Sequence, residues 1–309
     1  MTKHLVRRLF GTLVTLLVVS LITFVALMAT PGDAASAMVG DSATGAQLAA
    51  LRAELGLDQP LPARYGAFLA NLVLRGDLGR SLVSNRAVSD LIAERLAYTF
   101  ALALAAIALA AALGTAIGTA AAVRAGTKLD TALMGGAALG LAVPTFWSAL
   151  LLMMLFSLRL RWLPVVGAES WRHLVLPVIT LALPTAAIIA RLVRSSLLDV
   201  FGADYVRTAH AKGLAPRRVL TQHVIRNSLI PVVTVIGLHL GHLLGGAFVV
   251  ETIFGWPGLG RLTVQAIFDR DYPVVLGATL TVAVIYLAIN FLVDLAQGWL
   301  DPQVAHDAV

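Results

Sequence analysis

Two histidines, His239 and His242, lie three residues apart in a long uncharged stretch. Residues at this spacing share one face of a helix. The two imidazoles could line a pore and contact a substrate, lie along a metal path, or hydrogen-bond to neighbouring helices. A metal site would need further ligands, and none is obvious, so we predict no metal centre. The chain has no cysteine, which excludes disulfides, thiolate metal sites and a thiol nucleophile.

Other chemical motifs are missing from the sequence. No Gly-x-x-x-x-Gly-Lys-Ser/Thr loop is present, so any ATP-driven process would need an ATPase on a separate chain. No Gly-x-Ser-x-Gly motif is present, which disfavours an intramembrane hydrolase using His239 or His242 but leaves it as a weaker alternative. The stretches expected to span the membrane contain no Asp or Glu, and only Glu251 and Asp294 lie at their edges. This disfavours a carrier coupled to protons or sodium.

The composition indicates an integral membrane protein. Apolar residues make up 59% of the 309 residues, charged residues only 13%, and the mean hydropathy is +0.86. Soluble domains carry about 25% charged residues. The net charge of +6 comes from basic residues beside apolar runs, where they set membrane topology. The lipid bilayer is therefore an expected partner, and nucleic acid is not.

Six uncharged runs predict an all-α fold of six transmembrane helices. They are residues 9–30, 97–123, 131–158, 174–190, 227–250 and 274–293. The first run exceeds the apolar core of a cleaved signal peptide, about 7–15 residues, so we expect a retained span. The fourth contains Pro177 and Pro184 and is expected to be kinked. Cytoplasmic segments carry 12 Lys and Arg against 5 in the short outer loops, which predicts that both termini are cytoplasmic.

The runs also divide the chain. Residues 1–30 form the first span, 31–96 a small helical extracytoplasmic insertion, 97–293 the core, and 294–309 a cytoplasmic tail. In the insertion, Thr44 and Gln47 predict a capping box, Gly56 can end that helix, and a second helix is expected from about residue 62 to 75. Residues 88–96 have the pattern of a helix lying along the membrane surface.

Two features of the core suggest close packing and a loop. Gly237, Gly241 and Gly245 repeat at four-residue spacing, as do Gly114/Gly118 and Gly136/Gly140, which predicts close helix contacts. Residues 251–261 are apolar but rich in Gly and Pro. They can form a re-entrant loop covered by protein, or an aromatic anchor with Trp256 at headgroup level. The residues concerned are Phe254, Trp256, Pro257 and Gly258.

Residues 203–226 are polar and basic, although they lie between apolar runs. Asp204 can cap the start of a short helix, and Gly213 fits the left-handed position that ends it. Pro216 fits the first turn of a second helix. A charged helix pair between membrane spans is expected to contact a partner in water.

Several motifs in order carry a resemblance to a known family. They include Asp204-Tyr-Val-Arg-Thr-Ala-His-Ala-Lys-Gly213, His223-Val-Ile-Arg-Asn227, Val143-Pro-Thr-Phe-Trp147, Gly76-Asp-Leu-Gly-Arg-Ser81 and Glu251-Thr-Ile-Phe-Gly-Trp-Pro-Gly-Leu-Gly260. Over nearly its whole length, the chain resembles the first of the two permease types of ATP-driven dipeptide, oligopeptide and nickel importers. The resemblance implies a type I importer fold and a bacterial inner-membrane location.

The resemblance also implies roles for residues. The helix that begins at Asp204 would be the coupling helix, which docks on the ATPase. Arg207-Thr208-Ala209 stands where the wider superfamily has Glu-Ala-Ala, and Gly213 is retained. The residues implied in docking are Asp204, Tyr205, Arg207, Thr208, Ala209, Lys212 and Gly213. The 251–261 loop would be an outer gate or scoop.

The implied function is that of a non-catalytic pore subunit importing di- or oligopeptides by alternating access. Its implied partners are a second, related permease forming a heterodimer, two cytoplasmic ATPase subunits that bind ATP and Mg, and an extracytoplasmic substrate-binding protein. No cofactor is expected in this chain itself. The same machinery importing nickel, haem or glutathione is the alternative.

Overall fold

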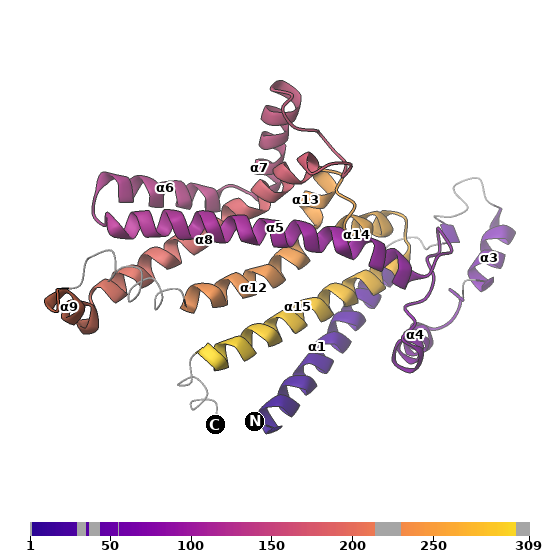
Figure 1. Cartoon of the computed structure of the whole chain (residues 1–309). Coiled ribbons are helices and arrows are strands. Elements are labelled where there is room, and N and C mark those ends of the chain that lie inside the picture. Colours follow the sequence, from indigo (N-terminus) through magenta and orange to yellow (C-terminus); the bar gives the residue numbers. More distant parts are fainter. Residues whose placement is uncertain (1, 30–34, 37–43, 55, 214–229, 301–309) are drawn as a thin grey trace. The chain divides into compact units, whose positions relative to one another are not determined.

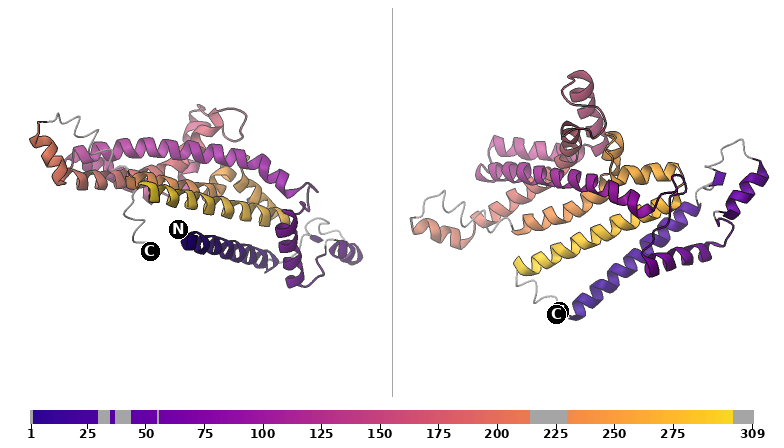
Figure 2. Two further views of the ribbon diagram at one scale, coloured as in Figure 1. Left: turned by 60° about the horizontal axis from the view of Figure 1, so that its bottom comes forward. Right: turned by 45° about the vertical axis from the view of Figure 1, so that its right-hand side comes forward.

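The computed structural model describes residues 2–29, 35–36, 44–54, 56–213 and 230–300. Within these ranges the regular elements are helices, apart from one isolated bridge between Arg80 and Ala87. Figures 1 and 2 show the helices as ribbons coloured along the sequence. The chain divides into two compact units. Unit 1 comprises residues 1–99 and 257–287, and unit 2 comprises residues 100–256 and 288–309.

Unit 1 contains the N-terminal helices, the start of α5, and the helices that follow the second boundary. They are α1 (Thr2–Ala29), α3 (Gly45–Glu54), α4 (Leu61–Arg75), the first part of α5 (Val88–Val123), α14 (Leu259–Phe268) and the first part of α15 (Tyr272–Leu300). Their buried core includes Val88, Ile92, Leu259 and Val274. The hydroxyl of Tyr65 on α4 lies 2.8 Å from that of Ser20 on α1, which joins the insertion to the first span.

The local signals of the insertion are confirmed, with one exception. The Thr44 N–H donates to Gln47 Oε1 at 3.0 Å, and the Gln47 N–H donates to the Thr44 hydroxyl at 3.4 Å, which is the predicted capping box. Gly56 has φ +63°, as a helix-ending glycine should. Residues 88–96, however, are not a separate surface helix. They begin α5, which continues unbroken for 36 residues (Figure 1).

Unit 2 contains the rest of α5 and the helices of the core. They are α6 (Lys128–Ala142), α7 (Thr145–Leu152), the π-helix η1 (Met153–Arg159), α8 (Arg172–Phe201), α9 (Asp204–Ala211), α12 (Ile230–Gly246), α13 (Phe248–Ile253) and the end of α15. Helices α5, α6 and α8 lie side by side (Figure 2).

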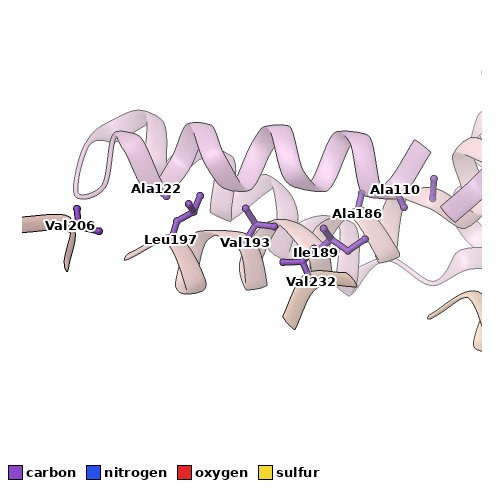
Figure 3. Packing of buried hydrophobic residues seen from close by; sticks show 9 residues of the cluster. Ala110, Ala122, Ala186, Ile189, Val193, Leu197, Val206 and Val232 are labelled. Carbon is purple, nitrogen blue, oxygen red and sulfur yellow. The ribbon is translucent and has the colours of Figure 1, made fainter. Parts of the chain in front are cut away.

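The contact between α5 and α8 is made at two glycines of α5. A Cβ on Gly118 would lie 2.5 Å from the carbonyl oxygen of Ala190, and one on Gly114 would lie 2.8 Å from that of Ala186. Neither position can hold a side chain unless the helices move apart, so the close packing predicted from this glycine pair is confirmed. Figure 3 shows Ile189, Val193 and Leu197 in a row along α8.

Described apolar helices lie in each of the six predicted regions, but at most five of them are long enough to span a membrane. Four are long and apolar enough to cross a membrane: Phe10–Ala29, Val88–Val123, Arg172–Phe201 and Tyr272–Leu295. Helix α6 and the stretch Thr145–Arg159 form a further region together, and Val232–Gly246 is a shorter apolar helix. The prediction of an all-helical membrane fold is confirmed.

The third region differs from its prediction as one uninterrupted span. It bends by 101° between α6 and the following stretch Thr145–Arg159. Val143 is extended, at φ −83° and ψ 122°, and Pro144 precedes the first residue of α7. Proline disfavours helical geometry in the residue before it and has no N–H to donate, so the helix breaks at this point.

The packing of α5 on α8 leads to a matched test with two alanine substitutions. We expect Gly118→Ala to destabilise the folded chain by about 1–3 kcal/mol, because the new methyl group meets the α8 backbone. The control is Gly136→Ala on α6, where nothing lies within 4 Å of the added Cβ. Thermal unfolding in detergent measures both. Equal melting temperatures for the two variants would contradict the close approach of α5 and α8.

Candidate functional site

Helix α9 runs from Asp204 to Ala211, and Gly213 follows two residues later with φ +77°, as expected of a glycine that terminates a helix. The Thr208 hydroxyl donates to the Asp204 carbonyl at 2.9 Å, and the Lys212 N–H donates to the Thr208 carbonyl at 3.0 Å. The side chains of Asp204, Thr208 and Lys212 are exposed. Tyr205, Arg207 and Ala209 lie on the same helix, while residues 214–226, including Pro216, lie outside the described residues.

Val206 attaches α9 to the rest of unit 2. It is only 2% exposed and belongs to the same buried cluster as Val193 and Leu197 of α8 and Val232 of α12 (Figure 3). Only Gly202 and Ala203 separate α8 from α9. The short helix therefore presents polar side chains to the outside while one apolar side chain holds it to the end of α8.

A charge pair that the sequence analysis missed joins the α5–α6 turn to α8. Arg194 donates from Nε to Oδ1 of Asp130 at 2.6 Å and from Nη2 to Oδ2 at 2.7 Å. The Gly126 N–H donates to the same carboxylate at 2.9 Å, and Asp130 is 4% exposed. Two parallel bonds fix the guanidinium plane as well as the charge. The only local signal was an acidic residue in the first turn of α6, close to Arg124 and Lys128.

The 251–261 segment is a helix, a short turn and a second helix. Residues 251–253 end α13, residues 254–258 form the turn, and α14 begins at Leu259. In unit 2, Phe254 is 2% and Trp256 5% exposed, and the Phe254 carbonyl accepts from the Gly167 N–H at 3.1 Å. In unit 1, Pro257 and Gly258 precede the Leu259 N–H, which donates to the Thr99 hydroxyl at 2.8 Å. Burial of Trp256 within the protein argues against a headgroup anchor.

His239 and His242 both line a cavity of about 360 Å³ in unit 2. Their ring centroids are 6.3 Å apart, with the rings nearly perpendicular. Residues of α7, α8 and α13 form the other walls. Among the described residues, no group of three or more His, Cys, Asp or Glu could hold a metal ion.

The three glycines of α12 differ in their surroundings. A Cβ on Gly237 would collide with the side chain of Val293 on α15, so these two helices are in close contact within unit 2. Gly241 is buried and Gly245 is exposed. In the third region, a Cβ added to Gly140 would lie 3.7 Å from the Cβ of Ala187, which is an ordinary contact. A Cβ added to Gly136 would meet nothing within 4 Å.

Comparison with known families identifies the chain. The family described as "Binding-protein-dependent transport system inner membrane component" matches residues 114–306, and its N-terminal counterpart matches residues 1–103. The chain belongs to this permease family. The resemblance drawn from the sequence motifs is confirmed.

Similar curated proteins and structures agree with this assignment. The chain is 44% identical over 306 residues to the "Glutathione transport system permease protein GsiC" of Pectobacterium atrosepticum, covering 99% of this chain and 100% of that one. The same-named protein of Escherichia coli K12 is 41% identical with the same coverage. A chain of the MetNI methionine ABC transporter matches with a TM-score of 0.53 and 17% identity, covering 69% of this chain and 95% of the other.

The family and the fold decide three of the earlier questions. The protein is a non-catalytic permease subunit of an ABC importer with the type I fold, and the alternative of an intramembrane hydrolase is set aside. It is a multi-pass protein of the bacterial inner membrane. ATP hydrolysis belongs to a separate subunit.

The Asp130–Arg194 pair is testable by a double-mutant cycle. We expect Asp130→Asn and Arg194→Gln each to destabilise the chain by about 1–3 kcal/mol, because each change leaves the other charge without its partner. The double variant should lose clearly less than the sum of the two. Arg191→Gln, at an exposed position of the same helix, is the control. Additive losses in thermal unfolding would show that the two side chains do not interact.

Proposed function

We propose that this permease forms the pore through which an ATP-driven importer takes up glutathione or a closely related short peptide. The observation that supports this substrate assignment is the 44% identity, across 99% of the chain, to a permease named for glutathione transport. Glutathione was one alternative within the predicted machinery, and it is itself a tripeptide. Because the similar permease is named for glutathione transport, we favour glutathione over longer peptides, nickel and haem.

The proposed assembly has four kinds of component. A second, related permease completes the pore as a heterodimer, and two cytoplasmic ATPase subunits bind ATP and Mg. An extracytoplasmic binding protein delivers the substrate, in keeping with the family description. Both termini lie in the cytoplasm and the 31–96 insertion lies outside, as the distribution of basic residues favours.

Helix α9 is the proposed contact with the ATPase. Its exposed polar face and its attachment through Val206 to the α8 cluster support this role. The docking residues are those proposed from the motif: Asp204, Tyr205, Arg207, Thr208, Ala209, Lys212 and Gly213. For ATP to drive transport, α9 must make different contacts in the two states of the importer.

The turn at residues 254–258 is the proposed outer gate. Support comes from its apolar sequence, from the burial of Phe254 and Trp256, and from its position between two helices. Pro257 and Gly258 break the helix here, which gives the segment a non-helical backbone that the protein covers.

Uptake by the assembled importer tests the substrate. We expect proteoliposomes that carry the four components, with the ATPase subunits and ATP on the inside, to accumulate radiolabelled glutathione. The reason is that this chain matches a glutathione permease along 99% of its length. Unlabelled glutathione should compete, whereas Ni²⁺ and haem should not. The control is the same vesicles without ATP. Accumulation of Ni²⁺ with no uptake or competition by glutathione would overturn the substrate assignment.

Gly213 offers a sharp test of α9 as the coupling helix. At φ +77° a β-branched residue is strained, whereas Asn tolerates the left-handed region. We expect Gly213→Val to lower ATP-dependent uptake by about 10-fold, the strain being about 1–2 kcal/mol. Gly213→Asn should retain most uptake. Membrane insertion, followed by protease protection, should be equal in both, and full uptake with Gly213→Val would contradict the assignment.

A further inference from the structure

The cavity between α7, α8, α12 and α13 has the features of a ligand site. Its volume of about 360 Å³ falls within the range of small-molecule sites, about 300–1,000 Å³. All its lining residues belong to unit 2. Most of the wall is apolar, including Phe146, Pro184 and Leu243, and a few polar side chains converge on it. Apolar walls with few polar groups are typical of sites that bind and orient a small molecule.

The two histidines are the most polar groups of this lining. Neither imidazole has a hydrogen bond or ion pair with another residue in the part of the chain that the structure describes. They lie on an apolar helix that is expected at membrane depth, where a polar group without a partner is costly. His239 is half-buried and His242 is exposed, so both side chains are accessible to a molecule that enters the cavity.

The remaining polar groups favour an anion over a cation. Thr145 and Thr185 also line the cavity, and none of the described residues that line it carries a carboxylate. The Thr185 hydroxyl already donates to the Leu181 carbonyl at 3.4 Å. Two histidines alone are a poor metal site, and no third ligand of the His, Cys, Asp or Glu type joins them among the described residues. Imidazole N–H groups are suitable donors to a carboxylate.

We propose that this cavity binds a carboxylate group of the transported peptide, with His239 and His242 as hydrogen-bond donors. The apolar wall formed by Phe146, Pro184 and Leu243 packs against the methylene groups of the same molecule. The inference rests on the proposed function, because it takes the substrate to be glutathione or a similar short peptide. It assigns to this permease a substrate contact of its own, separate from the binding protein.

Paired substitutions in the complete importer test the histidines. His239→Ala with His242→Ala should weaken binding of radiolabelled glutathione to the importer in nanodiscs, without the binding protein, by about 10-fold or more. His239→Gln with His242→Gln should recover part of the affinity, because the amide is also a donor. Leu238→Ala is the control, since this exposed residue is on the same helix but does not line the cavity.

A chemical change in the ligand tests the carboxylate. The diethyl ester of glutathione keeps the shape of the peptide but has no carboxylate charge. We expect the ester to bind the wild-type importer about 10-fold more weakly than glutathione and to bind the double alanine variant with little further loss. Equal affinity of glutathione for the wild-type importer and the double alanine variant would overturn the proposal, as would binding of Ni²⁺ alone that needs both histidines.

The failure of this proposal can be distinguished from failure of the proposed function. If the wild-type importer takes up glutathione and the double alanine variant binds it equally well, the substrate stands and the cavity is refuted. If the wild-type importer ignores glutathione but binds a dipeptide through His239 and His242, the cavity stands and the glutathione assignment falls.

Discussion

The close contact between α5 and α8 is the constraint on which unit 2 depends. Lipid is as apolar as a leucine side chain, so membrane helices gain little by simply hiding apolar surface from it, and packing at short distance has to hold them together. Gly114 and Gly118 allow this because each meets the α8 backbone directly. The other elements are then attached to α8: α6 through the Asp130–Arg194 pair, and α9 through Val206.

The helices are interrupted at two places, and the need to pair backbone groups in a membrane limits where such interruptions can occur. Irregular backbone at this depth is tolerated only where protein covers it. The turn after α13 meets this condition, since the Trp256 N–H donates to the Glu251 carbonyl at 2.8 Å and the Phe254 carbonyl accepts from Gly167. The break at Pro144 places the start of α7 beside the histidine cavity. The first interruption therefore lies in the proposed gate, and the second borders the cavity of the proposed substrate contact.

The signals that predicted the fold are local in the sequence. Uncharged runs, the Thr44 capping box and the glycine after α9 each act within a few residues, and the structure has them as expected. The bend at Pro144 was missed because hydropathy stays high through it. The Asp130–Arg194 pair was missed because its members are 64 residues apart and meet only once α6 packs on α8. The cavity was missed for the same reason, since its walls come from four helices.

Helix α8 connects the features that matter for transport. It is one helix from Arg172 to Phe201, and along it come the cavity wall around Thr185, the glycine contacts, Arg194 and the cluster that holds Val206. Thr185 and Leu197 are 12 residues apart, or about 18 Å at 1.5 Å per residue. A close-packed helix transmits a displacement over such a distance instead of absorbing it. A shift of α9 that moves the end of α8 therefore also changes the wall of the cavity, which gives the proposed coupling helix a direct mechanical route to the proposed substrate contact.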